Sequence, residues 1–409
     1  MKLQFHLLTA FPPHNVNRDE DGRPKTALLG ASPRGRISSQ AKKRALRFAP
    51  HFKDCQRATR TREAGILAFR RLVAAGLDEV DAAFAALGVN FALGGGDAKP
   101  TRETAQDLMT PQKRALDERE RAIERIMAKE GKERAAAEVA AKDRALGTDQ
   151  GLVMSTRERK RLDAALADLI TAHRDELAGT PAGVQAFVDR LTRDKLLTRE
   201  DIDEDTALFG RMVAADPSFN VEAAVAVSHA ITTHEFAIEG DYFSAGEELN
   251  VLGGTGAAIT SYAFFGSGTY YQHVVADVDH LRTNLDADGG RVERALSALL
   301  DGLAFAQPTG KRNSFASDVC ASYILVDKGD SPTCNLATAF LEPVRTSDPM
   351  TASIGRLKTF HDTLIEAYGL EVESLAFNGW QPARVGNTPP TGEVWTYEAL
   401  RRFVLADVT

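Results

Sequence analysis

The chain has 409 residues, of which 43% are hydrophobic and 26% charged, a balance that supports a sizeable core and excludes a disordered protein. No stretch approaches the roughly 20 consecutive apolar residues that a bilayer-spanning helix needs, and the polar N-terminus lacks a signal-peptide pattern. We therefore expect a cytoplasmic protein with no membrane partner, built as one large domain with an insertion or as two modest domains.

The formal charge of −7 is distributed unevenly along the chain. Residues 1–73 hold 16 Lys and Arg against 5 Asp and Glu, a balance of +11 that leaves −18 for the rest. A polyanion responds to the potential within a Debye length of about 8 Å at physiological salt, so a basic segment on an acidic protein can bind nucleic acid. The three cysteines include no C-x-x-C pair and predict neither a zinc site nor a disulfide framework.

The N-terminal region predicts a strand followed by a loop. Apolar residues at positions 3, 5 and 7 alternate with polar residues at 2, 4 and 6, the period of a half-buried β-strand. Residues 9–35 contain so many Pro and Gly that they exclude a long helix and predict an extended loop.

A helix is predicted next. Its N-cap would be Ser38 or Ser39, and Pro50 would block its continuation. The side chains expected to face the core, from their helical spacing, are those of Ala41, Ala45 and Phe48.

The same helix is the strongest candidate for a phosphate-binding surface. Long polar side chains would project from one face, and backbone N–H groups at its N-terminus could also bind a phosphate. A solvated basic face is the alternative. The candidate residues are Gln40, Lys43, Arg44 and Arg47 on the helix, with Arg18, Arg23, Lys25 and Arg34 in the preceding loop.

Beyond this helix the pattern is helical through residue 210, with a highly charged stretch at 101–146. Strand patterns return only after residue 220, at 270–278 and 319–326, with helices expected near 290–306, 351–368 and 396–404. The chain therefore predicts an α+β domain with a large, mostly helical insertion. Residues 239–268 alternate glycines with apolar and aromatic residues, which predicts a protruding loop or hairpin.

Two further clusters could carry chemistry. Lys311, Arg312 and Asn313 form a basic turn with Phe315 close behind, and an aromatic ring there could stack on a base or lie in the core. Asp19, in an acidic loop, could support metal-dependent hydrolysis or simply be solvated.

The histidines at 229 and 234 do not have the spacing of a zinc site. Five residues separate their positions by well over a hundred degrees on a helix, and no H-E-x-x-H pattern is present. We therefore expect them to be satisfied within a core strand. The sequence also contains no phosphate loop, no nucleophile elbow and no dinucleotide fingerprint.

Four blocks of the sequence, in order, resemble the CasC family, the backbone subunit that coats the guide RNA in type I-E CRISPR Cascade complexes. These blocks are Leu3–Arg18, Arg36–Arg47, Ala207–Met212 and Ser228–Glu235. Weaker similarity continues through residues 241–243 and 310–312, so it covers most of the chain. The charged insertion at 97–146 departs from the family's pattern.

The resemblance implies a modified ferredoxin-like palm of the RNA-recognition type, formed by residues 1–56 and 220–409. Residues 57–219 would be helical fingers, and a thumb at about 239–268 would carry Tyr242 and Phe243. The RNA-binding residues that the resemblance implies are Arg18, Lys25, Arg36, Ser38, Gln40, Lys43, Arg44, Arg47, Lys311, Arg312 and Asn313, with Met212 near a kinked base.

The function implied is non-catalytic. The partners would be the guide RNA, target DNA through the guide, other copies of the chain in a helical filament, and other Cascade subunits, with no cofactor and no metal. Three alternatives remain: a metal-dependent RNA-cleaving relative that uses Asp19, a guide-processing nuclease with His6 or His229 as general base, and a basic scaffold unrelated to CRISPR.

Overall fold

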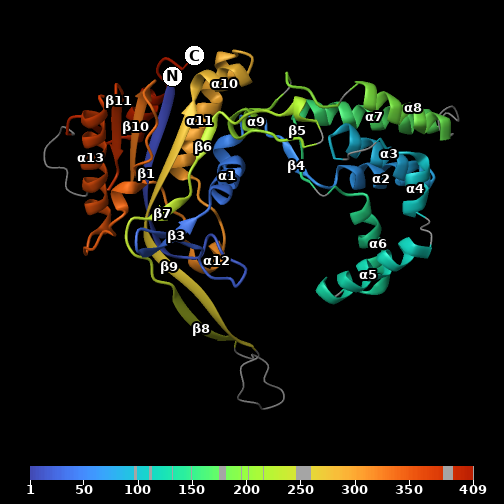
Figure 1. Ribbon diagram of the computed structural model, residues 1–409, viewed down its shortest axis with the longest axis horizontal. Coiled ribbons are helices and arrows are strands. Elements are labelled where there is room, and N and C mark those ends of the chain that lie inside the picture. Colours follow the sequence, from blue (N-terminus) through green and yellow to red (C-terminus); the bar gives the residue numbers. More distant parts are fainter. Residues whose placement is uncertain are drawn as a thin grey trace. The chain divides into compact units, whose positions relative to one another are not determined.

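The computed structural model describes residues 1–95, 99–109, 113–130, 132–148, 150–174, 181–194, 196–200, 202–214, 216–245, 259–380 and 390–408. The chain forms two compact units. The first consists of Met1–Cys55 and Ala224–Thr409 and contains the large sheet, and the second, Gln56–Ala223, is mostly helical (Figure 1).

A mainly antiparallel sheet forms the centre of the first unit. In the described residues it has ten strands, its main path runs β12-β11-β10-β1-β9-β7-β3-β2, and β6 and β8 also pair with β9. Only β11 and β12 pair in parallel among the described strands. The strands are β1 (Lys2–His14), β2 (Thr26–Leu29), β3 (Ser32–Ile37), β6 (Val225–Val227), β7 (Ala230–Thr232), β8 (Glu239–Ala245), β9 (Ile259–Asp277), β10 (Tyr323–Gly329), β11 (Glu373–Asn378) and β12 (Glu393–Val394).

Helices cover both faces of this sheet (Figure 1). On one face, α13 packs with a 3-10 turn against a buried cluster that includes Leu8, Tyr271 and Tyr323. The opposite face carries α1, α10 and α11. The helices are α1 (Ser39–Phe48), α10 (Val278–Asn284), α11 (Gly289–Phe305), α12 (Arg312–Phe315), α13 (Pro349–Tyr368) and α14 (Tyr397–Leu405), with 3-10 turns at Pro50–Phe52 and Leu336–Phe340.

The prediction of a half-buried first strand is wrong. β1 pairs with β10 and β9 along its two edges and helices cover both faces of the sheet, so Gln4 and His6 are only 6% and 1% exposed. These buried polar groups are satisfied: Gln4 Oε1 accepts the N–H of Cys334 at 3.0 Å, and His6 Nδ1 lies 2.9 Å from the hydroxyl oxygen of Tyr271. Alternation alone cannot distinguish a polar residue facing solvent from one facing a polar pocket.

The expected loop at 9–35 is wrong in part. β1 continues to His14 and a short hairpin of β2 and β3 follows, although the exclusion of a long helix is confirmed. The helices predicted near 290–306, 351–368 and 396–404 are confirmed as α11, α13 and α14. Local capping explains part of this success, since Asp288 and Asp348 accept backbone N–H groups at the starts of α11 and α13.

The helix after Ser38 is confirmed as α1, with Ser38 as its N-cap, but the prediction of its buried face is wrong in part: Ala41 packs against a core cluster, whereas Phe48 does not. Leu46 is fully buried, and a Cβ placed on Gly302 of α11 would lie 2.8 Å from its Cδ2 atom, so the two helices are in close contact here. Lys42 is also buried, and its Nζ donates to Gln307 Oε1 at 2.7 Å. Phe48 is instead 51% exposed.

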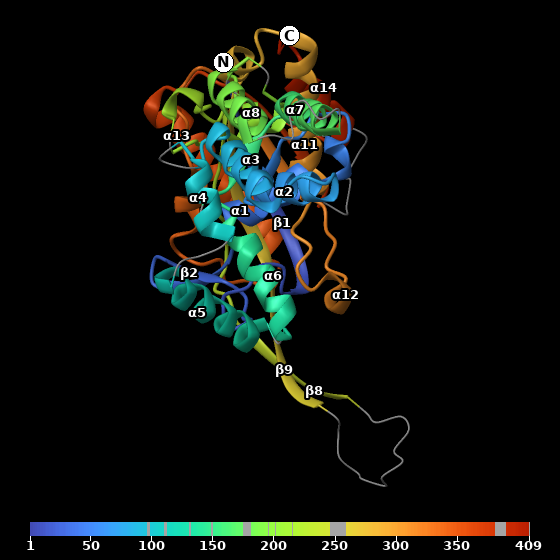
Figure 2. The same cartoon turned by 90° about the vertical axis from the view of Figure 1, so that its right-hand side faces the viewer.

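The described part of residues 239–268 forms a hairpin that extends away from the rest of the sheet (Figures 1 and 2). β8 pairs with the first part of β9, with Tyr242 opposite Tyr262 and Gly240 opposite Phe264, and every residue of β8 is exposed. The remaining part of the predicted hairpin, residues 246–258, lies outside the described residues.

In the second unit α2, α4 and α8 pack around α3, which carries apolar residues on all sides, most of them buried, while α5 and α6 pack against each other. A two-stranded sheet of β4 and β5, which the sequence did not indicate, accompanies them. No helix in the described residues is both long and apolar enough to cross a membrane. The elements are β4 (Thr59–Thr61), α2 (Ala64–Ala74), α3 (Glu79–Ala92), α4 (Arg102–Met109), α5 (Lys113–Glu130), α6 (Arg134–Ala145), β5 (Leu152–Met154), α7 (Thr156–Arg174), α8 (Pro181–Asp194) and α9 (Glu204–Phe209), with a 3-10 turn at Pro217–Phe219.

Candidate nucleic-acid interface

Hydrogen bonds join the end of β1, the β2–β3 hairpin and the start of α1. The N–H of Lys25 donates to Asn17 O at 2.9 Å, and the N–H of Arg36 donates to Lys25 O at 2.8 Å. The side chain of Asn17 extends the connection, because its Oδ1 accepts the N–H of Ser38 at 2.8 Å. Lys25 and Arg36 are thereby held beside the N-terminus of α1.

The N-terminus of α1 combines a helix dipole with nearby cations. Ser38 Oγ accepts the N–H of Ala41 at 3.3 Å, and His229 Nδ1 accepts the N–H of Ser39 at 3.0 Å. The pKa of His229 is lowered by partial burial first, and then by the positive charges of Arg36 and Lys25. A neutral His229, two cations and the positive end of the helix together attract an anion.

The expectation that His229 and His234 are satisfied by hydrogen bonds is confirmed, but the expectation that they lie in a core strand is wrong, because β7 ends at Thr232. His234 is bonded, since its Nε2 accepts the N–H of Thr269 at 3.1 Å. His229 is exposed and lies between β6 and β7 rather than within either.

The turn at Gly310–Arg312 lies beside the end of β1. A Cβ on Gly310 would lie 2.5 Å from the carbonyl oxygen of Val16, so only glycine permits this approach. Lys311, Arg312 and Asn313 are exposed on the turn, and Arg312 Nε donates to Asp318 Oδ2 at 2.8 Å. Two segments almost 300 residues apart in the chain are therefore neighbours.

The root of the β8–β9 hairpin contacts the loop after β1. Asn15 Nδ2 donates to Phe264 O at 2.6 Å, and the guanidinium carbon of Arg23 lies 4.8 Å from the centre of the Phe264 ring. Phe315, expected to be core or a base platform, is half-buried with its ring centre 5.8 Å from that of Phe265. Tyr242 and Phe243, farther along the hairpin, are exposed.

The predicted binding residues differ in accessibility. Exposed side chains belong to Arg18, Gln40, Arg44, Lys311, Arg312 and Asn313, and partly exposed ones to Lys25, Arg36 and Lys43. Ser38 and Arg47 are buried, at 6% and 7% exposure. The four-residue exposed face predicted for α1 thus lacks Arg47, because the helix is rotated so that positions 42, 46 and 47 face inward.

Arg34 does not belong to the exposed cations, contrary to expectation. It is 0% exposed, and its guanidinium donates to the carbonyl oxygens of Thr232 at 3.1 Å and Phe340 at 2.8 Å. These bonds tie β3 to β7 and to the 3-10 turn at Leu336–Phe340, so Arg34 supports the fold.

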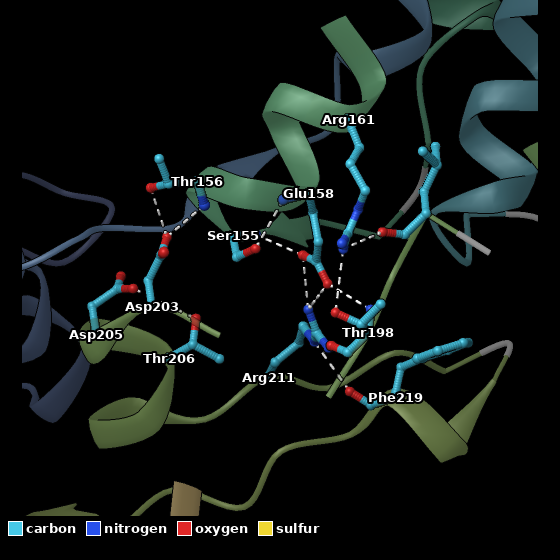
Figure 3. A network of polar contacts seen from close by, with 11 residues as sticks. Ser155, Thr156, Glu158, Arg161, Thr198, Asp203, Asp205, Thr206, Arg211 and Phe219 are labelled. Carbon is cyan, nitrogen blue, oxygen red and sulfur yellow. Dashed lines mark hydrogen bonds and ion pairs between the residues drawn. The ribbon is translucent and has the colours of Figure 1, made fainter. Parts of the chain in front are cut away.

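Met212 belongs to the second unit and is 76% exposed. The neighbouring Arg211 is fully buried and pairs with Glu158, whose two carboxylate oxygens lie 2.9 and 3.0 Å from Nη1 (Figure 3). Arg211 also donates to the carbonyl oxygens of Phe219 at 3.0 Å and Thr198 at 2.7 Å. An exposed methionine is thus presented by a loop with a buried ionic anchor.

The residues proposed for catalysis have structural partners. Asp19 Oδ1 accepts the N–H of Arg23 at 2.8 Å in an exposed turn. His6 is 1% exposed inside the sheet and lies 3.4 Å from Asp327, so it cannot reach a bound RNA without unfolding. Across the described residues, no group of three or more His, Cys, Asp or Glu is arranged to hold a metal ion.

A family model described as "CT1975-like protein", whose short name begins with "Cas", matches residues 3–388. The chain belongs to this family. No curated protein is significantly similar to it.

Two solved structures share the fold of this CT1975-like protein over its whole length. One is a chain of a "CRISPR RNA-guided surveillance complex, pre-nicking", with a TM-score of 0.73, 22% identity and 100% of both chains covered. The other is a chain of a "CRISPR RNA-guided surveillance complex", with a TM-score of 0.63, 20% identity and 99% of both chains covered.

Several residues that shape the candidate interface in this CT1975-like protein were not predicted as binding residues. Asn17 and Gly310 bring segments together, and the local sequence around each does not show which distant segment it contacts. His229 was noted only as a possible ligand or base. Its position beside α1 depends on the pairing of β7 with β3, which a single sequence does not reveal.

Proposed function

We propose that this CT1975-like protein is a non-catalytic RNA-binding backbone subunit of a CRISPR surveillance complex, of the CasC type found in type I-E systems. The single observation that carries the proposal is the convergence of Lys25, Arg36 and the N-terminus of α1 with the Gly310–Asn313 turn on one unit. The family and the shared fold with surveillance-complex chains support it.

The charges of this surface suit an external anion. Within the described part of the chain, Arg18, Lys25 and Lys311 make no ion pair, so their charges are available to a ligand. Cations and helix N-termini grip phosphates without reading base edges. A subunit that must accept any guide sequence needs this kind of contact and leaves base edges free to pair with target DNA.

In this proposal the first unit is the ferredoxin-like palm and the second unit the fingers. The β8–β9 hairpin is the thumb, which contacts a neighbouring copy in a helical filament along the guide. A head-to-tail interface that does not close generates such a filament. The complex would act in the cytoplasm in antiviral defence, together with other Cascade subunits.

The proposal is tested by co-expressing the chain with a repeat-spacer array and sequencing the RNA that survives nuclease treatment. We expect intact RNA protected in steps of constant length. Arg18→Glu/Lys311→Glu should abolish protection, since both side chains are exposed and neither substitution removes an internal ion pair. Arg345→Glu, on an exposed loop residue next to the cluster under α13, is the matched control and should protect RNA normally. If the Arg18→Glu/Lys311→Glu variant protects RNA as well as the control does, the proposal is contradicted.

The catalytic alternatives make a different prediction in the same preparation. Cleavage of RNA that requires Mg²⁺ and disappears in Asp19→Ala would establish the metal-dependent relative. Cleavage without metal that disappears in His229→Ala would establish a general-base nuclease. We expect neither activity from the purified protein.

A further inference from the structure

A groove of about 610 Å³ opens between α1 and the segment that leads from α11 to α12. This volume lies in the range of small-molecule sites, about 300–1,000 Å³. Two of its lining residues, Arg44 and Arg312, are among the predicted RNA-binding cations, and Gly310 also lines it. The groove lies wholly within the first unit.

Aromatic rings line this groove. Phe48 is 51% exposed, and the guanidinium carbon of Arg44 lies 4.8 Å from its ring centre. Phe305 is 42% exposed, with its ring centre 5.5 Å from that of His51 and 4.9 Å from that of Tyr397. Tyr397 in turn donates to Asp301 at 2.6 Å, which holds the support behind Phe305 in place.

The charges of the groove are mainly positive. Among the described residues that line the groove, Asp318 is the one acidic residue. It forms an ion pair with Arg312, and the side chains of Arg312 and Asp318 are 60% and 58% exposed. Such exposed pairs are weak and exchange readily with another anion. Arg44 has no acidic partner among the described residues and sits over an aromatic face.

We propose that this groove holds one unstacked nucleobase of the bound RNA, against Phe48 or Phe305, with the adjoining phosphates at Arg44 and Arg312. Splayed bases stack on aromatic rings and on arginine planes, while cations hold the strand. A purely apolar peptide would cover the two arginines without supplying an anion, whereas a nucleotide supplies a flat ring and a phosphate together. The inference rests on the proposed function.

The test uses a short single-stranded oligoribonucleotide and the same oligomer with abasic nucleotides, which keeps the phosphates but lacks the rings. We expect Phe48→Ala/Phe305→Ala to bind intact RNA roughly 5- to 150-fold more weakly than the wild type. Its affinity for abasic RNA should be unchanged. Phe48→Trp should retain the wild-type preference for intact RNA.

The controls separate the failure of this inference from failure of the proposed function. Tyr368→Ala removes a more exposed aromatic ring, at 73% exposure, from the end of α13 and should not change binding of either oligomer. A wild-type protein that binds neither oligomer would overturn the proposed function itself. If the double variant binds both oligomers more weakly by the same factor, or binds both as tightly as the wild type, the proposed base site is wrong. A change only in the length of RNA-bound assemblies would assign the groove to a segment of a neighbouring copy, and would also overturn it.

Discussion

The candidate interface around α1 and the Glu158–Arg211 pair of the second unit use cationic side chains in opposite ways. At the interface, Arg18, Lys25 and Lys311 are accessible and form no ion pair with the described residues. Arg211 is 0% exposed, with Glu158 and two backbone carbonyls as partners (Figure 3). An arginine whose acceptors are internal stabilises the fold, whereas one without internal acceptors is available to a ligand.

The centre of the sheet holds a second buried network. Asp327 Oδ1 lies 2.9 Å from His361 Nε2 and accepts the hydroxyl of Ser374 at 2.6 Å. Burial alone would raise the pKa of Asp327, but the hydrogen bonds from His361 and His6 outweigh it and hold the pKa below its usual value. These groups lie on the side of the sheet that α13 covers, away from α1, and we assign them a structural role.

The largest expected effect comes from breaking the buried pair. Glu158→Gln leaves Arg211 buried without a full counter-charge, and removing one partner of such a pair costs about 3–5 kcal/mol. We expect the free energy of unfolding of the helical unit, measured by urea denaturation with circular dichroism, to fall by this amount. The matched control is Asp163→Asn, which removes the exposed contact with Arg71 and should cost less than about 1 kcal/mol. Equal losses of unfolding free energy in Glu158→Gln and Asp163→Asn would contradict the distinction between buried and exposed ion pairs.

Lys42 sharpens the comparison, because it is a buried cation with a neutral partner. Burial lowers its pKa from 10.5 to about 7. Between these values the unfolded chain binds the proton more tightly than the folded chain, so the free energy of unfolding should rise with pH by up to ~1.4 kcal/mol per unit.

Denaturation at pH 7, 8 and 9 checks this dependence on Lys42. The rise should be absent in Lys42→Met, which keeps the apolar stem and has no titratable group. A wild-type stability that is flat across this range, or a rise that persists in Lys42→Met, would show that burial does not shift Lys42.

Removing one interface cation should weaken RNA binding with little effect on stability. In Lys25→Ala, the slope of log K against log salt for single-stranded RNA should decrease by about 0.7. Fluorescence anisotropy at several salt concentrations measures this slope. Arg345→Ala, an exposed arginine outside the interface, should leave it unchanged. A melting temperature lowered as much as in Glu158→Gln would instead place Lys25 with the structural charges.

The smallest expected effect is on the exposed Arg312–Asp318 pair. Asp318→Asn should change the free energy of unfolding by less than about 1 kcal/mol, because both groups are largely solvated. It should strengthen RNA binding slightly, since Arg312 no longer has an internal competitor for phosphate. Weaker RNA binding in Asp318→Asn would show that the pair positions Arg312 for its ligand.

The sequence by itself determined the local elements and the identity of the basic segments. Capping residues and apolar periodicity act within a few residues, which is why α1, α11, α13 and the helical insertion could be predicted. The clusters at Arg36–Arg47 and Gly310–Asn313 were visible for the same reason, as runs of cations in the chain.

Only the tertiary structure decided which of these residues share a surface and which are buried. The rotation of α1, which exposes Phe48 and buries Lys42, depends on its contact with Gly302 of α11. The meeting of Gly310 with Val16, and of Glu158 with Arg211 across 53 residues, likewise depends on distant parts of the chain. Such contacts arise from packing between elements, and local sequence patterns carry no record of the partner.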